Sequence, residues 1–287
     1  MQVYGLLGQN ISYSLSPYMH NAAFKALDIK AEYKVFDIPE AGLKNFFLRI
    51  KSREISGCNI TIPYKEKAID FVDKYEDLVK DIGAINTAGF KEGLLYGYNT
   101  DYHGFKQALE GNAEGDLGFK PNGKNIFIFG AGGAAKAIIY NLINKSARRV
   151  IIADIDSAKA ENLAAYIIKN TDSKTETVIT VIKDRSKYEE FISKTDLLIN
   201  ATPCGMRKSD PGLFDYRYIH DKLYIFDIVY TTETPLVKEG KYRGKAAISG
   251  LNMLLYQATE AFYIWTGKRP PIDIMRKTLL QKVNEIR

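Results

Sequence analysis

The residues best suited to chemistry include a glycine-rich segment near the middle of the chain. Gly130, Gly132 and Ala135 follow four apolar residues, 126–129, and fit the pattern G-x-G-x-x-[GA]. In that pattern the first glycine makes a tight turn, the second lets a pyrophosphate approach the backbone, and the third small residue lets a helix pack on the strand. The segment therefore predicts a site for a dinucleotide, a kind of cofactor that carries hydride.

The residues after this turn would complete such a site. Gly133 and Ala134 open a predicted helix that runs to Asn144. The free N–H groups and the positive dipole end of that helix suit phosphates. A second apolar run, 150–153, ends at Asp154, where an acidic residue commonly holds the ribose of NAD. The glycines could instead form a plain turn, but strand, turn, helix, strand and acid in this order favour the cofactor site.

Four dense polar clusters lie in the first hundred or so residues, where predicted strands end. They are the segments 14–17 (SLSP), 59–65 (NITIPYK), 85–87 (INT) and 99–101 (NTD). Open α/β sheets place their ligands at such strand ends. Most of these residues also have a structural interpretation. Ser16 could cap a helix, and Asn59 and Thr61 could face water. Asn86 and Asp101 could be turn residues.

The elements that must position these residues alternate between strand and helix. In the first part we expect strands at 3–7, 33–38 and 55–62, helices at 17–27, up to 50 and at 65–79, and a hairpin over 84–98. Such alternation indicates an open α/β sheet. A helix beginning at Lys65 puts a cation at the positive end of the helix dipole, so this lysine needs a reason beyond helix stability.

A loop rich in glycine, asparagine and proline, residues 111–123, divides the chain into two α/β domains. Beyond the strands already named we expect strands at 178–182, 197–200 and 223–229, and the dinucleotide-binding part closes near residue 248. Two helices follow, 253–265 and one from 272 to the end. Periodicity does not say which domain these helices join.

The composition and charge of the chain limit the classes of function that we expect for it. The 287 residues are 46% hydrophobic, and 40 basic and 34 acidic residues give a net charge of +6. The basic residues form no run with interleaved aromatics, so we expect no nucleic-acid partner. No apolar run approaches the ~20 residues of a membrane span and no signal peptide is evident, so we expect a cytoplasmic protein without a membrane partner. Cys58, Cys204 and three histidines show no metal-ligand spacing, so we expect no metal.

The clusters, in this order and spacing, resemble the shikimate dehydrogenase family over nearly the whole chain. The matching segments are 14–17 with 19–21 (MHN), 59–65, 82–87 (IGAINT), 99–101, the glycine turn at 130, 200–206 (NATPCGM), 227–230 (DIVY) and 250–254 (GLNML) with Gln257. The resemblance implies an N-terminal substrate domain, 1–110, completed by C-terminal helices within 249–287 that return to it, and a Rossmann domain, 111–248. It also implies reversible hydride transfer between shikimate and a nicotinamide cofactor, giving 3-dehydroshikimate.

The same resemblance implies roles for individual residues. The carboxylate of shikimate would be held by Ser14 and Ser16, with Tyr230 beside it. Its hydroxyls would be held by Thr61, Asn86, Asp101 and Gln257. Cofactor contacts are expected at Gly130, Gly132, Gly133, Ala134, Asp154, Thr202 and Gly250.

Lys65 and Asp101 would form the catalytic pair. Oxidation of an alcohol requires its hydroxyl to lose a proton while hydride leaves. A lysine ammonium can polarise that oxygen, and a nearby carboxylate can anchor both the lysine and the neighbouring hydroxyl. The sequence leaves open which of the two moves the proton, and Lys65 as the acid/base is a hypothesis.

One departure from the family pattern concerns the cofactor. Family members that use NADP carry Asn-Arg-Thr directly after the second Rossmann strand, whereas this chain has Asp154, Ile155 and Asp156 there. Because a carboxylate repels a phosphate and accepts hydrogen bonds from a ribose diol, we expect NAD to be preferred and NADP to be possible. In the alternative interpretation, Asp156 or Ser157 caps the next helix and Lys159 contacts the phosphate.

Two alternatives to the main interpretation remain open. The missing arginine also resembles the NAD-dependent quinate/shikimate dehydrogenase branch, although the serine pair favours shikimate over quinate. A catalytically silent dinucleotide-binding protein on the same scaffold is disfavoured because Lys65 and Asp101 are both present. We expect a monomer or a homodimer.

Overall fold

The structure is a computed structural model that describes residues 1–170, 178–181, 184–207 and 209–286. The chain divides into two compact units, Met1–Gly104 with Leu255–Arg287, and Phe105–Leu254. Both crossings fall inside a helix, α4 (Thr100–Glu110) and α9 (Leu251–Thr266). The sequence-based boundaries, after 110 and after 248, stay predictions. They lie near the ends of these helices because loop-forming residues mark where a helix ends and not where packing changes.

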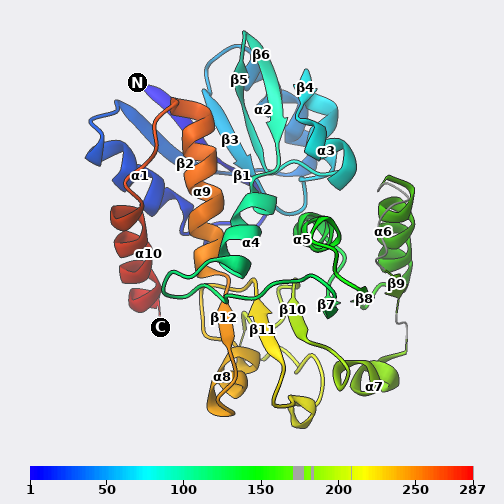
Figure 1. Ribbon diagram of the computed structural model, residues 1–287. Coiled ribbons are helices and arrows are strands. Elements are labelled where there is room, and N and C mark those ends of the chain that lie inside the picture. Colours follow the sequence, from blue (N-terminus) through cyan, green and yellow to red (C-terminus); the bar gives the residue numbers. More distant parts are fainter. Residues whose placement is uncertain (171–177, 182–183, 208, 287) are drawn as a thin grey trace. The chain divides into compact units, whose positions relative to one another are not determined.

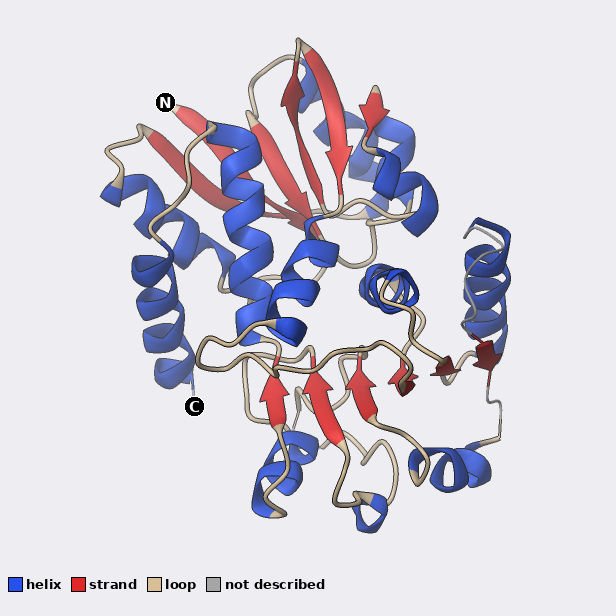
Figure 2. Ribbon diagram, viewed as in Figure 1, coloured by secondary structure: helices blue, strands red, loops and turns tan. Residues whose placement is uncertain are grey.

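The first unit is built on a six-stranded mixed sheet with the order β2-β1-β3-β5-β6-β4 (Figure 2). β1, β2 and β3 are parallel, whereas β5 is antiparallel to both β3 and β6. The C-terminal ends of β1, β3 and β6 and the start of β5 therefore share one edge of the sheet. The strands are β1 (Gln2–Gly8), β2 (Ala31–Asp37), β3 (Gly57–Ile60), β4 (Lys74–Tyr75), β5 (Thr87–Lys91) and β6 (Leu94–Tyr98).

Helices cover this sheet, and the C-terminal ones belong to the same unit. They are α1 (Ser16–Ala26), α2 (Leu43–Lys51), α3 (Asp77–Ile82), the start of α4, most of α9 and α10 (Ile272–Ile286), with 3-10 turns at Glu40–Gly42 and Lys67–Phe71. α10 packs against α1 (Figure 1). Trp265 of α9 donates its indole N–H to the carbonyl of Ala88 on β5, at 3.0 Å. Gly57 and Gly89 leave room for the indole, because a Cβ at either would lie 3.0 Å or less from its ring.

Most predicted elements of this unit are confirmed, but the helix expected over 65–79 is wrong. A 3-10 turn (Lys67–Phe71), the short strand β4 and only then α3 occupy that stretch. Sheet pairing explains the difference, since β4 pairs with β6 and Asp73 exchanges hydrogen bonds with the backbone of Leu95 (2.8 and 2.9 Å). Lys65 lies in a turn, so the argument that it opposes a helix dipole is also wrong.

The second unit is a doubly wound parallel sheet with the order β12-β11-β10-β7-β8-β9. Numbered along the unit, this order is 6-5-4-1-2-3, the arrangement of dinucleotide-binding sheets, and the direction of winding reverses between β7 and β10. The strands are β7 (Asn125–Phe129), β8 (Arg149–Ala153), β9 (Val178–Val181), β10 (Leu197–Asn200), β11 (Tyr224–Asp227) and β12 (Ala247–Ser249). Ile182, the last residue of the expected strand 178–182, lies outside the described residues.

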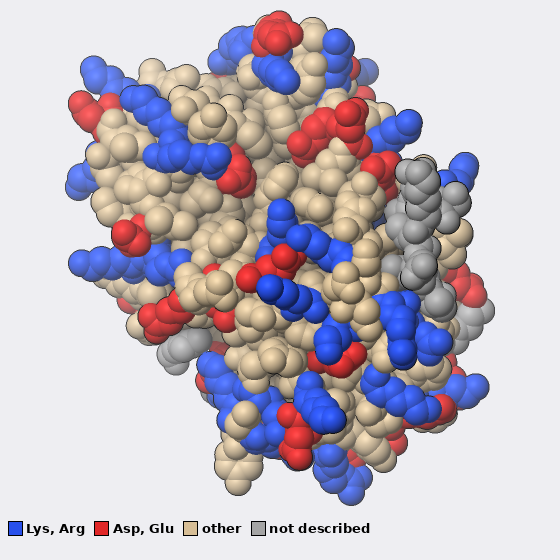
Figure 3. All heavy atoms as spheres, in the orientation of Figure 1, with Lys and Arg blue, Asp and Glu red and all other residues tan. Residues whose placement is uncertain are grey.

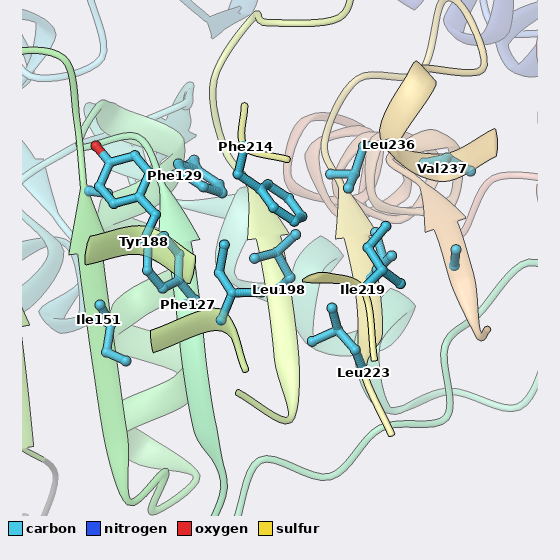
Figure 4. Close-up of a cluster of buried hydrophobic side chains, with 14 residues drawn as sticks. Phe127, Phe129, Ile151, Tyr188, Leu198, Phe214, Ile219, Leu223, Leu236 and Val237 are labelled. Atoms are coloured by element: carbon cyan, nitrogen blue, oxygen red, sulfur yellow. The ribbon is translucent and has the colours of Figure 1, made fainter. Parts of the chain in front are cut away.

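Helices flank the second sheet. They are α5 (Gly133–Asn144), α6 (Ser157–Asn170), α7 (Tyr188–Ile192) and α8 (Pro235–Tyr242), with 3-10 turns at Arg185–Lys187 and Tyr216–Tyr218. The sequence analysis did not predict α7, α8 or β12. One core of this unit gathers Phe127, Ile151, Leu198, Tyr188 and Leu236 (Figure 4). Because both faces of a parallel sheet are covered, its strands are continuous apolar runs, which is why β7, β8 and β10 were predictable.

No helix among the described residues is both long and apolar enough to cross a membrane. Lysine and arginine side chains lie among aspartate and glutamate side chains on the face shown in Figure 3.

Asp227 is a buried carboxyl group at the end of β11. It accepts hydrogen bonds from Asn200 Nδ2 (2.9 Å), the Val229 N–H (3.0 Å) and Thr234 Oγ1 (2.7 Å). Loss of solvation on burial nevertheless raises its pKa from 3.8 to about 6. The ionised carboxylate therefore destabilises the folded unit relative to the neutral acid.

We expect Asp227→Asn to stabilise the protein increasingly as pH rises. The stability contribution of the wild-type group is fully present below its unfolded pKa of 3.8 and is lost as pH rises through about 6. Asparagine keeps the shape without the charge and can donate to Thr234 Oγ1. In thermal melts, the difference between variant and wild type should grow from about pH 4 to about pH 6.5, reach about 1–3 kcal/mol at most, and then level off. A difference independent of pH would contradict this interpretation.

Candidate active site

An ion pair lies at the edge of the first sheet where β3 and β6 end. Lys65 Nζ is 2.5 Å from Asp101 Oδ2, and the two side chains are only 13% and 9% exposed. Water and salt screen such a partly buried pair much less than an exposed one. The attraction therefore fixes the position of each group relative to the other.

The turn after β3 positions Lys65 through its backbone. The Lys65 carbonyl accepts the N–H of Ile85 (2.9 Å), and the Thr61 N–H is bonded to the carbonyl of Leu7 (2.9 Å). Between them, the fully buried Tyr64 donates its hydroxyl to the carbonyl of Ile38 (2.8 Å). The chain is thus anchored on both sides of the lysine, and only the side chain of Lys65 is free to adjust.

The start of α4 positions Asp101. Just before the helix, Asn99 accepts the N–H of Tyr102 on Oδ1 (3.2 Å) and donates Nδ2 to the carbonyl of Ala84 (2.9 Å). This arrangement caps the helix, and a carboxylate in its first turn is favoured by the dipole. Asn86 donates Nδ2 to Asp101 Oδ1 at 2.9 Å. Each oxygen of the carboxylate therefore has a protein partner, Lys65 on one and Asn86 on the other.

The two serines predicted to hold a carboxylate follow β1 at the same edge of the sheet. Ser14 and Ser16 are 6% and 4% exposed, and the Ser16 N–H is bonded to Ser14 Oγ (3.3 Å). The interpretation of Ser16 as a capping side chain is wrong, because α1 begins at Ser16 itself and Leu15 occupies the cap position. Within the described parts of the chain the Ser16 hydroxyl has no hydrogen-bond partner, so it is available to a ligand.

The remaining predicted substrate residues divide between the units. Thr61 is half-buried and precedes Lys65 in the same turn. Gln257 of α9 is 7% exposed, and its Oε1 lies 3.5 Å from Thr100 Oγ1. The first unit therefore brings Thr61 and Gln257 to the edge that carries the ion pair. Tyr230 follows β11 in the second unit, and its contact with the substrate stays a prediction.

Behind the pair lies a layer of buried polar residues whose hydrogen bonds to one another the sequence analysis did not predict. Asn59 does not face water: it is 4% exposed and donates to Thr87 Oγ1 at 2.9 Å. Asn86 is 2% exposed and donates to Thr100 Oγ1 at 2.9 Å as well as to Asp101. A signal was available, since asparagine and threonine within otherwise apolar strands must find partners when they are buried.

The second unit carries the glycine turn at the point where its winding reverses. Gly130 has φ +106°, and a Cβ there would lie 2.8 Å from the carbonyl oxygen of Ala201. At Gly132, which precedes α5 with φ −83°, a Cβ would meet nothing within 4 Å. Packing within the protein therefore explains why position 130 is a glycine, but it does not explain the glycine at position 132. Open space beside a helix N-terminus fits the pyrophosphate of a dinucleotide, with Gly133 and Ala134 opening the helix.

Three other residues expected at the cofactor have partners within the unit. Thr202 Oγ1 donates to Asn200 Oδ1 (2.7 Å). A Cβ at Gly250 would overlap the backbone of Ile228, so packing is sufficient to explain that glycine. Asp154 accepts the N–H of Ala131 on Oδ2 (2.8 Å) and the N–H of Asp156 on Oδ1 (3.0 Å). Its carboxylate therefore ties the glycine turn to the end of β8.

Among the described residues, His20 and His103 make no hydrogen bond to the Lys65–Asp101 pair. His20 is fully buried, neither of its ring nitrogens has a hydrogen-bond partner among the described residues, and burial lowers its pKa to about 3. It is therefore a neutral ring at physiological pH. His103 is exposed. The described part of the chain holds no group of three or more His, Cys, Asp or Glu side chains that could bind a metal ion.

Comparison with known proteins yields consistent matches along the chain. Residues 6–88 match a family described as "Shikimate dehydrogenase substrate binding domain", residues 113–206 one described as "Shikimate / quinate 5-dehydrogenase", and residues 250–280 one described as "Shikimate 5'-dehydrogenase C-terminal domain". A curated relative from Methanococcoides burtonii, named shikimate dehydrogenase (NADP(+)), is 39% identical over 284 residues and 99% of each chain.

Solved structures agree with the sequence relatives. The crystal structure of shikimate dehydrogenase from Aquifex aeolicus is 35% identical, with a TM-score of 0.86 over 97% of each chain. A shikimate dehydrogenase solved in complex with NADP+ is 34% identical, with a TM-score of 0.87 over 99% of this chain and 96% of that one.

The expected preference for NAD is wrong. Eight curated relatives, 35–39% identical, are all named as NADP(+) enzymes, and one structural neighbour was solved with NADP+. The expectation depended on Asp154 facing a ribose diol, but its oxygens accept the N–H of Ala131 in the glycine turn and the N–H of Asp156, two residues further along the chain. Asp156 Oδ1 accepts the N–H of Lys159 (3.1 Å), as the capping alternative requires.

Substitution by alanine should have different effects at the two glycines of the turn. Gly132→Ala should leave the thermal midpoint unchanged, because its Cβ meets no protein atom within 4 Å, and should weaken NADP+ binding at least about tenfold by filling the phosphate space. Gly130→Ala should destabilise the protein by at least about 1–2 kcal/mol, because alanine is strained at positive φ. Thermal melts and titration calorimetry measure both quantities. Unchanged affinity in Gly132→Ala would remove that residue from the cofactor site.

Proposed function

Since this chain belongs to the shikimate dehydrogenase family, we propose that it catalyses the reversible oxidation of shikimate to 3-dehydroshikimate with NADP+. Full-length relatives at 35–39% identity support the activity and the cofactor. The observation that carries the proposal is the Lys65–Asp101 pair, 2.5 Å apart at the sheet edge that also carries the serine pair.

The residues of the first unit fit the parts of this substrate. Ser14 and Ser16 offer hydroxyl groups to its carboxylate, and Thr61 and Gln257 offer polar groups to its ring hydroxyls. The bound nicotinamide would supply the hydride acceptor. The chain must supply a group that holds the reacting hydroxyl and moves its proton.

We assign the proton transfer to Lys65 rather than to Asp101. Both oxygens of Asp101 are already engaged, one by Lys65 and one by Asn86. An ammonium has three N–H donors, and Asp101 accepts one of them. Lys65 can therefore contact the substrate oxygen while Asp101 acts as its anchor. The ammonium gives a proton to that oxygen when the ketone is reduced, and the neutral amine takes the proton from the hydroxyl when the alcohol is oxidised.

We expect Lys65→Ala to lower kcat about 100- to 10,000-fold while changing KM for shikimate little, because the lost interaction is strongest in the transition state. Lys67→Ala is the matched control: it removes a lysine two positions away whose exposed ammonium pairs with Glu40. Initial-rate kinetics on both variants test the assignment. A Lys65→Ala enzyme that retains most of its turnover would exclude Lys65 from the chemistry.

Initial rates with shikimate and quinate, each against NADP+ and NAD+, test the substrate and the cofactor. We expect kcat/KM to be highest for shikimate with NADP+. Faster oxidation of quinate would assign the chain to the quinate-oxidising branch of the family. Dinucleotide binding without turnover of either acid would instead favour a catalytically silent binding protein.

A further inference from the structure

A continuous row of hydrogen bonds leads from Tyr33 on β2 to the candidate catalytic carboxylate. Tyr33 Oη donates to Asn59 Oδ1 (2.7 Å), and Asn59 Nδ2 donates to Thr87 Oγ1 (2.9 Å). Thr87 Oγ1 donates to Asn86 Oδ1 (3.2 Å), and Asn86 Nδ2 donates to Asp101 Oδ1 (2.9 Å). We call these four bonds the donor row. All five residues are 6% exposed or less.

Backbone groups fix the direction of three of the four bonds in the donor row. The nitrogen of the Asn59 amide faces the carbonyl of Asn86 (3.4 Å), which can only accept, so Oδ1 faces Tyr33 and the tyrosine must donate. The oxygen of the Asn86 amide faces the N–H of Thr100 (2.7 Å), which can only donate, so Nδ2 faces Asp101. Thr87 accepts from Asn59 and has its own hydrogen left to give to Asn86 Oδ1 or to Thr100 Oγ1, each 3.2 Å away. Thr100 Oγ1 lies 3.1 Å from the same Asn86 oxygen, so both routes lead to Asn86.

The hydrogen bonds of the donor row strengthen one another. Each hydrogen bond polarises the next, and the effect is larger in a water-poor interior. The donor row ends on Asp101 Oδ1, the oxygen not paired with Lys65. It therefore holds one oxygen of the carboxylate in place and leaves the other oxygen facing the lysine.

Tyr33 is itself held tightly. Asn21 of α1 accepts the Tyr33 N–H on Oδ1 (2.8 Å) and donates Nδ2 to the Tyr33 carbonyl (3.0 Å). The ring stacks on neutral His20, with centroids 4.3 Å apart and planes 5° apart. From the outer strand β2 the hydroxyl reaches past β1 to Asn59 on β3. Because both the backbone and the ring of Tyr33 are held in place, its hydroxyl is directed towards Asn59.

We propose that Tyr33 is a positioning residue for the reaction, acting through Asn59, Thr87 and Asn86 to hold Asp101 against Lys65. This inference rests on the proposed function, because Asp101 and Lys65 are the groups taken to meet the substrate. Without the Tyr33 hydroxyl, Asn59 Oδ1 is left unsatisfied in the interior, and the Asn59 amide loses the contact that holds it in place against Thr87 Oγ1.

Tyr33→Phe tests the proposal, with Tyr4→Phe as the matched control. Tyr4 is 1% exposed, sits opposite Tyr33 on the adjacent strand β1, and its hydroxyl has no part in the donor row. We expect Tyr33→Phe to lower kcat about threefold to tenfold, the loss for one net hydrogen bond, with KM for shikimate changed less than about twofold. Tyr4→Phe should keep wild-type kcat. Equal kcat in the two variants would overturn the proposal.

A double-mutant cycle separates positioning from a loss of stability. Thr87→Val breaks the donor row at its middle with little change of shape. If Tyr33 acts through Thr87, the double variant Tyr33→Phe/Thr87→Val should have the kcat of Thr87→Val alone. Losses of kcat that multiply would mean that the two residues act independently, and would contradict the donor row as the route.

A second readout does not depend on turnover. The side-chain amide resonances of Asn86, assigned by NMR with an Asn86→Ala sample, should shift in Tyr33→Phe and stay in place in Tyr4→Phe. Unmoved resonances would overturn the proposal even if the wild-type protein were inactive on shikimate. Inactivity of the wild type would count against the proposed function alone, so the two failures are distinguishable.

Discussion

The contact between the Lys65 ammonium and the Asp101 carboxylate is the constraint around which the first unit is organised. The two residues are 36 positions apart, and a distance of 2.5 Å between their charged atoms requires two separate strand ends to meet at one edge. The mixed sheet achieves this, because β6 runs in the same direction as β3 and β5 returns between them. An all-parallel sheet would need a long crossover at each step.

The side chains around this pair are buried, so each of their polar groups needs a hydrogen-bond partner. Polar groups in the interior cost free energy unless they are bonded, so the asparagines and threonines behind Asp101 have to satisfy one another. They do so with backbone groups that can only donate or only accept, which removes the freedom of each amide to flip. The requirement for satisfied polar groups and the requirement for a fixed carboxylate are thus met by the same bonds.

The second unit illustrates how the same residue type serves different purposes. Gly130 is demanded by a left-handed backbone and by the approach of Ala201, whereas Gly132 leaves space that no protein atom fills. Asp154 occupies the position at which an acid often binds the ribose, yet one of its oxygens accepts the N–H of Ala131 in the glycine turn and the other accepts the N–H of Asp156. The NADP(+) relatives contradict the preference for NAD, and the bonds of Asp154 give this acid a role in holding the glycine turn that the like-charge argument did not consider.

The sequence by itself determined the α/β class, the glycine turn, the strands β7 to β11 of the second sheet and the family. These depend on local features: apolar runs, turn residues and ordered motifs keep their meaning whatever they pack against. Tertiary structure alone decided the course of residues 65–79, where pairing of β4 with β6 prevailed over a helical pattern. It also decided which way Asn59 and Asp154 face, because the partner of a polar side chain depends on strands that are distant in sequence and become neighbours only in the folded sheet.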